Sequence, residues 1–475
     1  MAKFLNHDIS APVGGLLQNL GQVDPVGIVG TVDPAGLGKG WRADVATILQ
    51  HFANEHARPL CLASLYGDGP TSHDPEVKAL YQPDERRFLL GQTSVATRDE
   101  LEAQTPEPDT VFHATGAPDI PRRDRTPLIA DRRNDSNLIL SQLHLAFMPC
   151  HNKAVAELAA RGTPGAEVFA TMRQLVTLHY HWLVLNDVLP ALLSKTVLAR
   201  PLAQWQPRPL PAGTVPMEFT TAAFRFGHSM VGRAYDFNAN FGQGGRISTA
   251  GASLLQLFAF TSQGNMEDPR GPPRQLPDHW VIDWDRLTRN QAPDAGPDPV
   301  SGKAERFDLD FAPDMLNVAG DAQVVEHGSI LFRNLLRGFH RRIPFGQHLA
   351  REYGVTLLSR AALRAAMPQH RSPSGDFPDP ATAAAALGLL EETPAWLYFL
   401  CEAQVIEGGS RVGPTASRII ADTIVSLMGH DPSSVLRHKG GGWHPRDSLL
   451  KDHSGQPLDT IRRFLLFASD HTAAV

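Results

Sequence analysis

The stretch Met217-Glu218-Phe219-Thr220-Thr221-Ala222-Ala223-Phe224-Arg225-Phe226-Gly227-His228-Ser229-Met230 decides how the rest of the chain is interpreted. It is rich in apolar residues and has no proline after Pro216, so it is compatible with a buried helix. Its one unusual residue is His228, which follows a glycine and lies three positions after Arg225. A lone histidine in such a segment is more often a buried structural residue than a ligand.

The alternative interpretation is that His228 is an axial ligand of haem iron. Gly227 would then leave room for a flat macrocycle, and Arg225 would reach a haem propionate. Nothing inside this stretch decides between the two interpretations, so the decision depends on the rest of the chain.

Composition places the protein among ordinary globular chains. Its 475 residues are 42% hydrophobic and 20% charged, with a net charge of -6, which gives no reason to expect nucleic acid or an anionic membrane surface as a partner. We find no uninterrupted apolar run long enough to span a bilayer, and no signal-peptide pattern at the N-terminus. The three widely spaced cysteines, Cys61, Cys150 and Cys401, predict free thiols and a cytoplasmic protein.

Apolar periodicity predicts a mainly α chain. We expect two long helices at 137–160, bent at Pro149, and at 168–193, and shorter helices at 41–57, 329–338, 345–353, 396–405 and 416–428. Between them lie long irregular connections, rich in proline, glycine or charge, at 71–130, 263–305 and 368–384. No internal repeat or linker separates two cores, so we predict one large domain over residues 1–475.

Three further stretches accompany the opening one: Lys3-Phe4-Leu5-Asn6-His7-Asp8, Asp131-Arg132-Arg133-Asn134-Asp135-Ser136-Asn137 and Arg333-Asn334-Leu335-Leu336-Arg337-Gly338. Together they resemble the animal-type haem peroxidases of the peroxidase–cyclooxygenase superfamily, as do the segments 143–152, 181–190 and 407–414. The resemblance covers about residues 1–436 and is that of an atypical, bacterial-like member. It implies a single large helical haem-peroxidase domain with long irregular loops.

On the proximal side of the haem, the resemblance assigns four residues. His228 would bind the iron, and Asn334 would hydrogen-bond the other ring nitrogen and fix its tautomer. Arg225 and Arg337 would pair with the propionates, because a buried carboxylate without a cationic partner is costly.

On the distal side, the resemblance assigns a base and a cation. His7 would take a proton from hydrogen peroxide and return it to the leaving oxygen. Arg133 would stabilise the charge that develops as the O–O bond breaks. Each residue alone also has a structural interpretation, but their joint order favours the haem interpretation.

The distal pocket departs from the family pattern. Lys3 replaces a glutamine that is associated with halide and water, and Asn6 replaces an aspartate that forms an ester to haem. Ser136 occupies a second ester-forming position, with Asn137 beside it. We therefore predict non-covalent haem b. We also hypothesise that Lys3 keeps His7 neutral and recruits a carboxylate substrate.

The family's calcium site also departs from the pattern. Asp8 matches the first ligand, but the loop positions are Ala57, Cys61 and Ala63, none of which offers a hard oxygen side chain. We predict that calcium is absent and that Arg58 pairs with Asp8.

The resulting functional hypothesis is a peroxidase that reduces hydrogen peroxide through a ferryl intermediate and oxidises a small organic substrate. A specialised step in bacterial natural-product biosynthesis would fit such an altered pocket. One alternative is a fatty-acid dioxygenase, which Arg225 disfavours because those enzymes use a tyrosine there. The other is a non-catalytic haem protein, which would not need Arg133 beside His7. The electron donor, the use of halide and the oligomeric state stay open.

Overall fold

The computed structural model describes residues 1–9, 28–29, 53–55, 60–94, 117–123, 126–210, 214–262, 275–288, 304–316, 329–368, 378–440 and 442–469. Helices dominate this part of the chain, so the predicted mainly α class is confirmed. The α-helices are α1 (Ala2–Ile9), α3 (Ala63–Tyr66), α4 (Pro75–Lys78), α6 (Leu138–Ala160), α7 (Gly165–Leu183), α8 (Leu189–Leu192), α9 (Met217–Thr221), α10 (Trp284–Thr288), α11 (Ile330–His340), α12 (Gly346–Glu352), α13 (Arg360–Ala366), α14 (Pro380–Ala386), α15 (Ala395–Glu407), α16 (Pro414–His430) and α17 (Ile461–Ser469).

Short 3-10 segments and one π-helical segment join these helices. They are η1 (Arg132–Asp135), the π-helix η2 (Val184–Val188), η3 (Leu202–Gln204), η4 (Ala223–His228), η5 (Gln256–Phe258), η6 (Asp278–Trp280), η7 (Pro313–Leu316), η9 (His438–Gly440) and η10 (Pro445–Asp447).

The strands are only two or three residues long and pair in antiparallel fashion. They are β1 (Ile28–Val29), β2 (Ala53–Glu55), β3 (Gly91–Gln92), β4 (Pro118–Asp119), β5 (Arg122–Arg123), β6 (Thr126–Pro127), β7 (Thr214–Pro216), β8 (Ala234–Tyr235) and β9 (Ala252–Ser253). The largest sheet has the order β1-β2-β7, with Asn54 opposite Val215. The helix expected at 41–57 is therefore wrong at residues 53–55, and its other residues lie outside the described part.

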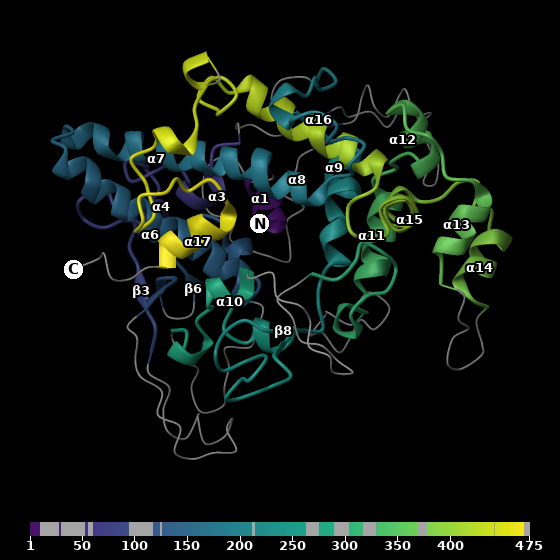
Figure 1. Cartoon of the computed structure of the whole chain (residues 1–475), viewed down its shortest axis with the longest axis horizontal. Helices are drawn as coiled ribbons and strands as arrows, with labels where there is room; N and C mark the ends of the chain where they lie inside the picture. Colours follow the sequence, from purple (N-terminus) through teal and green to yellow (C-terminus); the bar gives the residue numbers. More distant parts are fainter. Residues whose placement is uncertain are drawn as a thin grey trace.

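The two long helices α6 and α7 pack against each other and form the core of one half of the molecule (Figure 1). Asn137 caps α6 by accepting a hydrogen bond from the Leu140 backbone N–H. Pro149 lies inside α6 without ending it, and the helix continues to Ala160. These helices confirm the two longest segments expected from the apolar pattern, although α7 passes into the π-helix η2 where one continuous helix was predicted.

The N-terminal helix α1 is anchored to this half by aromatic packing. Phe4 stacks on Phe147 of α6 with ring centroids 5.0 Å apart, and Phe147 in turn contacts Phe464 of α17 at 4.7 Å. All three rings are fully buried. In Figure 1, α1 lies near the centre of the molecule, with α6, α7 and α17 on one side and α9, α11 and α15 on the other.

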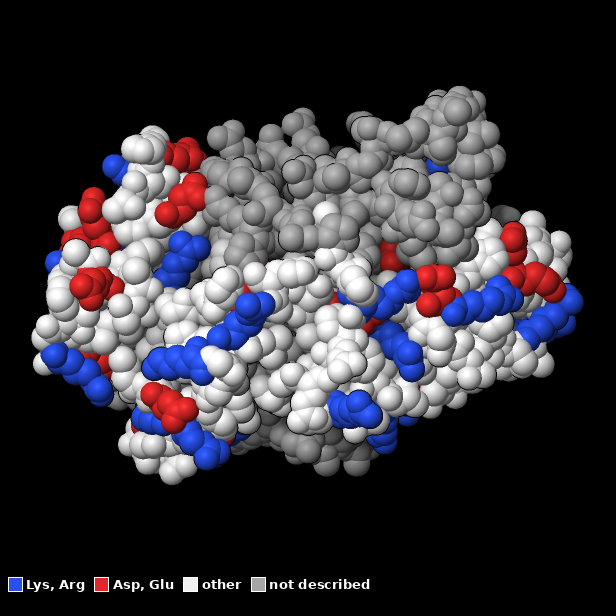
Figure 2. Space-filling model, turned by 90° about the horizontal axis from the view of Figure 1, so that it is seen from above, with Lys and Arg blue, Asp and Glu red and all other residues white. Residues whose placement is uncertain are grey.

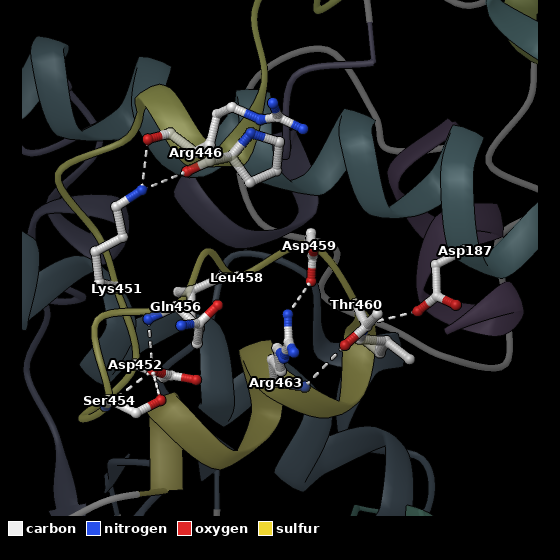
Figure 3. A network of polar contacts seen from close by, with 12 residues as sticks. Asp187, Arg446, Lys451, Asp452, Ser454, Gln456, Leu458, Asp459, Thr460 and Arg463 are labelled. Atoms are coloured by element: carbon white, nitrogen blue, oxygen red, sulfur yellow. Dashed lines mark hydrogen bonds and ion pairs between the residues drawn. The ribbon is translucent and has the colours of Figure 1, made fainter.

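The segment that leads into α17 is fixed by polar contacts, which Figure 3 shows. Asp187 in η2 accepts a hydrogen bond of 2.6 Å from the backbone N–H of Ile461, at the first residue of α17. Asp459 pairs with Arg463 at 2.8 Å, and Lys451 donates to two backbone carbonyls of η10. Apart from Asp187, these residues lie beyond the span of the family resemblance, and the contact between Asp187 and Ile461 ties α17 to η2.

The described surface carries charges of both signs. On the face shown in Figure 2, basic and acidic side chains are intermingled with uncharged ones. Among the helices that the structure describes, none combines the length and the apolar character that a membrane-spanning segment requires.

Candidate functional site

The segment that carries His228 is not one continuous helix, contrary to what the apolar stretch suggested. The α-helix α9 ends at Thr221, and Ala222 breaks it with φ -133° and ψ -58°. The chain then forms the 3-10 helix η4, whose last residue is His228. Residues three apart eclipse each other in a 3-10 helix, so Arg225 and His228 project from the same side.

This bend is held by contacts with the helices packed around it. Trp396 of α15 donates through Nε1 to the carbonyl oxygen of Arg225 at 3.3 Å. Phe219 and Phe224 stack with ring centroids 4.8 Å apart across the break. The fold thus keeps the backbone around His228 in a defined position.

His228 has a partner on its Nδ1 atom. The side chain of Asn334, on α11, places Nδ2 2.9 Å from His228 Nδ1. Burial, followed by the positive charges of Arg225, Lys3 and Arg337, lowers the pKa of His228 to about 3, against the raising effect of Asn334. The ring is therefore neutral at physiological pH, which is the form that binds a metal.

Space is available beside His228. A Cβ atom built on Gly227 would meet no atom within 4 Å, so the backbone here borders an open space. His228 itself is only partly buried, although dense surrounding protein lowers its pKa. Both observations fit a ring that the described protein atoms do not cover completely.

The distal candidate, His7, is buried in α1 and is held by an asparagine that the sequence analysis did not single out. His7 Nδ1 lies 2.8 Å from Oδ1 of Asn134, in η1. Nδ2 of the same amide lies 3.0 Å from Nδ1 of His144, in α6. Because Asn134 Oδ1 only accepts, His7 carries its proton on Nδ1 and keeps Nε2 as a free base. Asn134 directly follows Arg133 in one of the segments that resemble the family.

The electrostatic surroundings keep His7 neutral. Burial, followed by the charges of Arg133 and Lys3, lowers the pKa of His7 well below 6.5, against the raising effect of Asn134. Arg133 lies close by, donating from Nη2 to the backbone carbonyl of His7 at 3.0 Å. Its guanidinium is oriented by Asp131, with Nη2 and Oδ2 2.6 Å apart. The predicted distal base and cation are thus brought together.

Lys3 lies one turn before His7 on the same face of α1. Its Nζ atom donates to Oγ of Ser136 at 2.5 Å, so two positions that depart from the family pattern contact each other. Asn6 is partly buried on α1, while the side chain of Asn137 serves as the N-cap of α6. Asn137 was predicted to lie near the distal pocket. In the structure its side-chain oxygen is engaged as the cap of α6.

The two histidine segments border the same region. The helix α1 contacts η4, and the charge of Lys3 depresses the pKa of both His7 and His228. Lys3 keeps an exposed side chain although burial lowers its pKa to about 8. These features place the charge of Lys3 near both histidines.

Two arginines supply positive charge next to His228. Burial and the neighbouring charge of Arg337 lower the pKa of Arg225 to about 9. Arg225 donates from Nε to the carbonyl oxygen of Thr220 at 3.0 Å, and within the described residues no carboxylate pairs with it. Two close, partly buried guanidinium groups repel each other, and the two propionates of haem would offset this repulsion. The residues present therefore fit haem.

The carboxylate of Asp8 is satisfied by backbone and by a cation from α7. Its oxygens accept hydrogen bonds from the backbone N–H groups of Leu62 at 3.1 Å and Ser64 at 3.2 Å. Burial raises the pKa of Asp8 to about 6, while these bonds and the charge of Arg173 lower it. Arg173 also donates to Cys61 Sγ at 3.9 Å.

The predicted partner, Arg58, and the loop position Ala57 lie outside the described residues, and Ala63 is buried at the start of α3. Whether calcium binds at Asp8 therefore stays a prediction. All three cysteines are free thiols, with Cys150 and Cys401 buried.

Part of the chain matches a known protein family. The family model described as animal haem peroxidase matches residues 86–266, a segment that contains Arg133, Asn134, Ser136, Arg225 and His228. Among solved structures, peroxidase A from Dictyostelium discoideum is similar with 18% sequence identity and a TM-score of 0.49. The match covers 80% of this chain and 66% of that one. No curated protein gives a significant match.

Proposed function

Because the animal haem peroxidase family model matches residues 86–266, we propose that the chain is a haem peroxidase that reduces hydrogen peroxide and oxidises a small organic substrate. The observation that carries this proposal is a pair of buried or partly buried histidines, His7 and His228, each with an asparagine on Nδ1, in segments that contact each other.

When bound, haem supplies the iron at which the O–O bond of the peroxide is cleaved. His228 would be the proximal ligand, through Nε2. This requires the proton on Nδ1, and a half-turn of the Asn334 amide places Oδ1 opposite Nδ1 to accept it. Arg225 and Arg337 would pair with the propionates.

The distal residues manage protons and charge. The unprotonated Nε2 of His7 accepts a proton from the peroxide oxygen nearer the iron and returns it to the departing oxygen, which leaves as water. Arg133 provides positive charge next to this base, and its contacts with Asp131 and the His7 carbonyl fix its position. Because burial and nearby cations hold His7 neutral, the base is ready at physiological pH.

We further propose that the haem is haem b and is held without covalent bonds. Asn6 is an amide and Ser136 a hydroxyl engaged by Lys3, so neither offers the carboxylate that an ester to haem requires. Acidified organic solvent should therefore extract all the haem and leave colourless protein. Haem that stays with the polypeptide would refute this proposal.

Stopped-flow absorbance spectroscopy tests the activity. Haem-loaded protein mixed with hydrogen peroxide should show a rapid change of the Soret band, followed by recovery when an organic donor is added. The variant His7→Ala, with the same haem content, should lose the rapid phase. A Soret band that does not change in the native protein would contradict a peroxidase.

The two alternatives have weaker support. A fatty-acid dioxygenase would need a tyrosine at position 225. This chain has Arg225 there, close to a second cation, Arg337. A non-catalytic haem protein has no use for a neutral base and an oriented guanidinium on the distal side. A role in a specialised biosynthetic pathway stays a prediction.

A further inference from the structure

Lys3 is the cation that the proposed peroxidase chemistry does not use. It contacts Ser136 Oγ through Nζ at 2.5 Å and makes no ion pair with any described carboxylate. An ammonium group has three N–H donors, so one is engaged by Ser136 and two remain for a ligand. Two N–H donors match the two oxygens of a carboxylate.

The acidic groups near Lys3 are already committed to other partners. Asp131 pairs with Arg133 at 2.6 Å, and Asp135 pairs with Arg122 at 2.8 Å through side chains that are almost completely buried. Asp8, the acid on α1 itself, accepts hydrogen bonds from backbone N–H groups.

The other charged groups that act on His7 and His228 are cations. Arg225 and Arg337 flank His228, and Arg133 lies beside His7. Haem would bring two propionates for Arg225 and Arg337, and Asp131 neutralises Arg133. Among the described residues, Lys3 then has no carboxylate partner, and it lies one turn from the proposed base His7.

We propose that Lys3, positioned by Ser136, binds the carboxylate of an organic donor and so makes the enzyme selective for anionic substrates. This inference rests on the proposed function, because it places the donor in the same site. A lysine head group is well suited to this role as a mobile point charge, while Arg133 is held by Asp131 and the His7 backbone. The pKa of Lys3, which burial lowers to about 8, still leaves it mostly charged at pH 7.

A spectroscopic titration tests the proposal in the haem-loaded protein at pH 7. Benzoate serves as the carboxylate probe, and benzamide, its uncharged analogue of similar shape, as the control ligand. We expect benzoate to shift the Soret band and the variant Lys3→Met to weaken its binding about tenfold or more, because a charge-assisted contact is lost. Lys3→Arg should keep most of the affinity, and benzamide should bind all variants equally weakly.

The matched control is Lys195→Met, which removes an exposed lysine between α8 and η3. This variant should bind benzoate like the native protein. Equal benzoate affinity in the native protein and Lys3→Met would overturn the proposal. So would chloride or nitrate that displaces benzoate at equal concentration, because the site would then select small inorganic anions.

A second measurement needs no haem. Amines of the apo-protein are acetylated with acetic anhydride in the presence or absence of benzoate, and the modified peptides are quantified by mass spectrometry. Benzoate should slow acetylation of Lys3 several-fold and leave Lys195 unaffected. If Lys3 is modified at the same rate with and without benzoate, it does not bind carboxylates. This readout separates a failure at Lys3 from a failure of the peroxidase proposal, which would show as an unreactive Soret band.

Discussion

The distal and proximal histidines are held in the same way but are not equally constrained. His7 and His228 each have an asparagine on Nδ1, at 2.8 and 2.9 Å. Asn134 presents its oxygen to His7 and its nitrogen to His144. Asn334 presents its nitrogen to His228 and makes no second side-chain hydrogen bond within the described residues.

This difference indicates which partner sets each tautomer. On the distal side the amide of Asn134 lies between two histidine rings, so its orientation is coupled to the tautomers of both His7 and His144. On the proximal side the amide of Asn334 is able to turn, so iron itself selects the tautomer of His228. The tautomer of the proposed base, His7, thus depends on contacts within the protein, whereas that of the proposed ligand, His228, depends on the cofactor.

The largest expected effect separates the two histidines. His228→Ala should abolish stoichiometric haem binding, because the iron loses its only proposed protein ligand, whereas His7→Ala should bind haem normally. Haem titration monitored by the Soret band measures both. If His228→Ala retains native affinity, the assignment of the proximal ligand is wrong.

The next effect concerns rate. His7→Ala should slow the reaction of the haem-loaded protein with peroxide by about 10²–10⁴-fold, the usual contribution of a positioned general base. The rate constant comes from stopped-flow mixing at several peroxide concentrations. A rate within a factor of three of the native value would mean that His7 is not the base.

Loss of the asparagines should distinguish the two sides further. Asn334→Ala should weaken haem binding by roughly 10–100-fold, as expected for the loss of an outer-shell partner of a metal ligand. Asn134→Ala should leave haem affinity unchanged and slow the peroxide reaction. The comparison would fail if both variants affected the same quantity.

The pH dependence reports on the cations around His7. Because the pKa of His7 is depressed, the base stays neutral and the peroxide rate should be constant from pH 8 down to below pH 6.5. Lys3→Met removes a positive neighbour, so the pKa of His7 should rise and the rate should begin to fall at higher pH than in the native protein. An acid limb at the same pH in both proteins would show that Lys3 does not act on His7.

The smallest expected effect concerns the support of α1. Arg173→Ala should lower the free energy of unfolding by about 1–3 kcal/mol, since Asp8 loses its nearby cation. Arg360→Ala, which breaks an exposed ion pair with Glu391, should cost less than about 1 kcal/mol. Thermal denaturation with and without calcium completes the test, and stabilisation of the native protein by calcium would contradict the prediction that the ion is absent.

The sequence predicted the long helices and the residues of the site better than the contacts between them. The apolar periodicity of α6 and α7 and the order of the motifs were sufficient to place His7, Arg133 and His228 in segments that meet. The break at Ala222 was missed, because tertiary contacts such as Trp396 to the Arg225 carbonyl impose it.

Contacts between distant segments were also beyond prediction. Two of these contacts, His7 with Asn134 and Lys3 with Ser136, join residues more than one hundred positions apart in the sequence. The contact of Asn134 with His144 is local by comparison. These contacts form only in the folded chain. Neither Asn134 nor Ser136 carries a sequence signal that identifies its partner. The short helix α17 lacked the length that makes apolar periodicity decisive.

The rings of Phe4, Phe147 and Phe464 pack in series, and this has a consequence for how the protein is made. The helix that carries His7 is synthesised long before residue 464, whose ring packs against Phe147 and so supports the partner of Phe4. At typical rates of synthesis the two are separated by roughly tens of seconds. The support of the distal side is therefore completed only after α17 has emerged, so capture of haem is expected to follow the synthesis of α17.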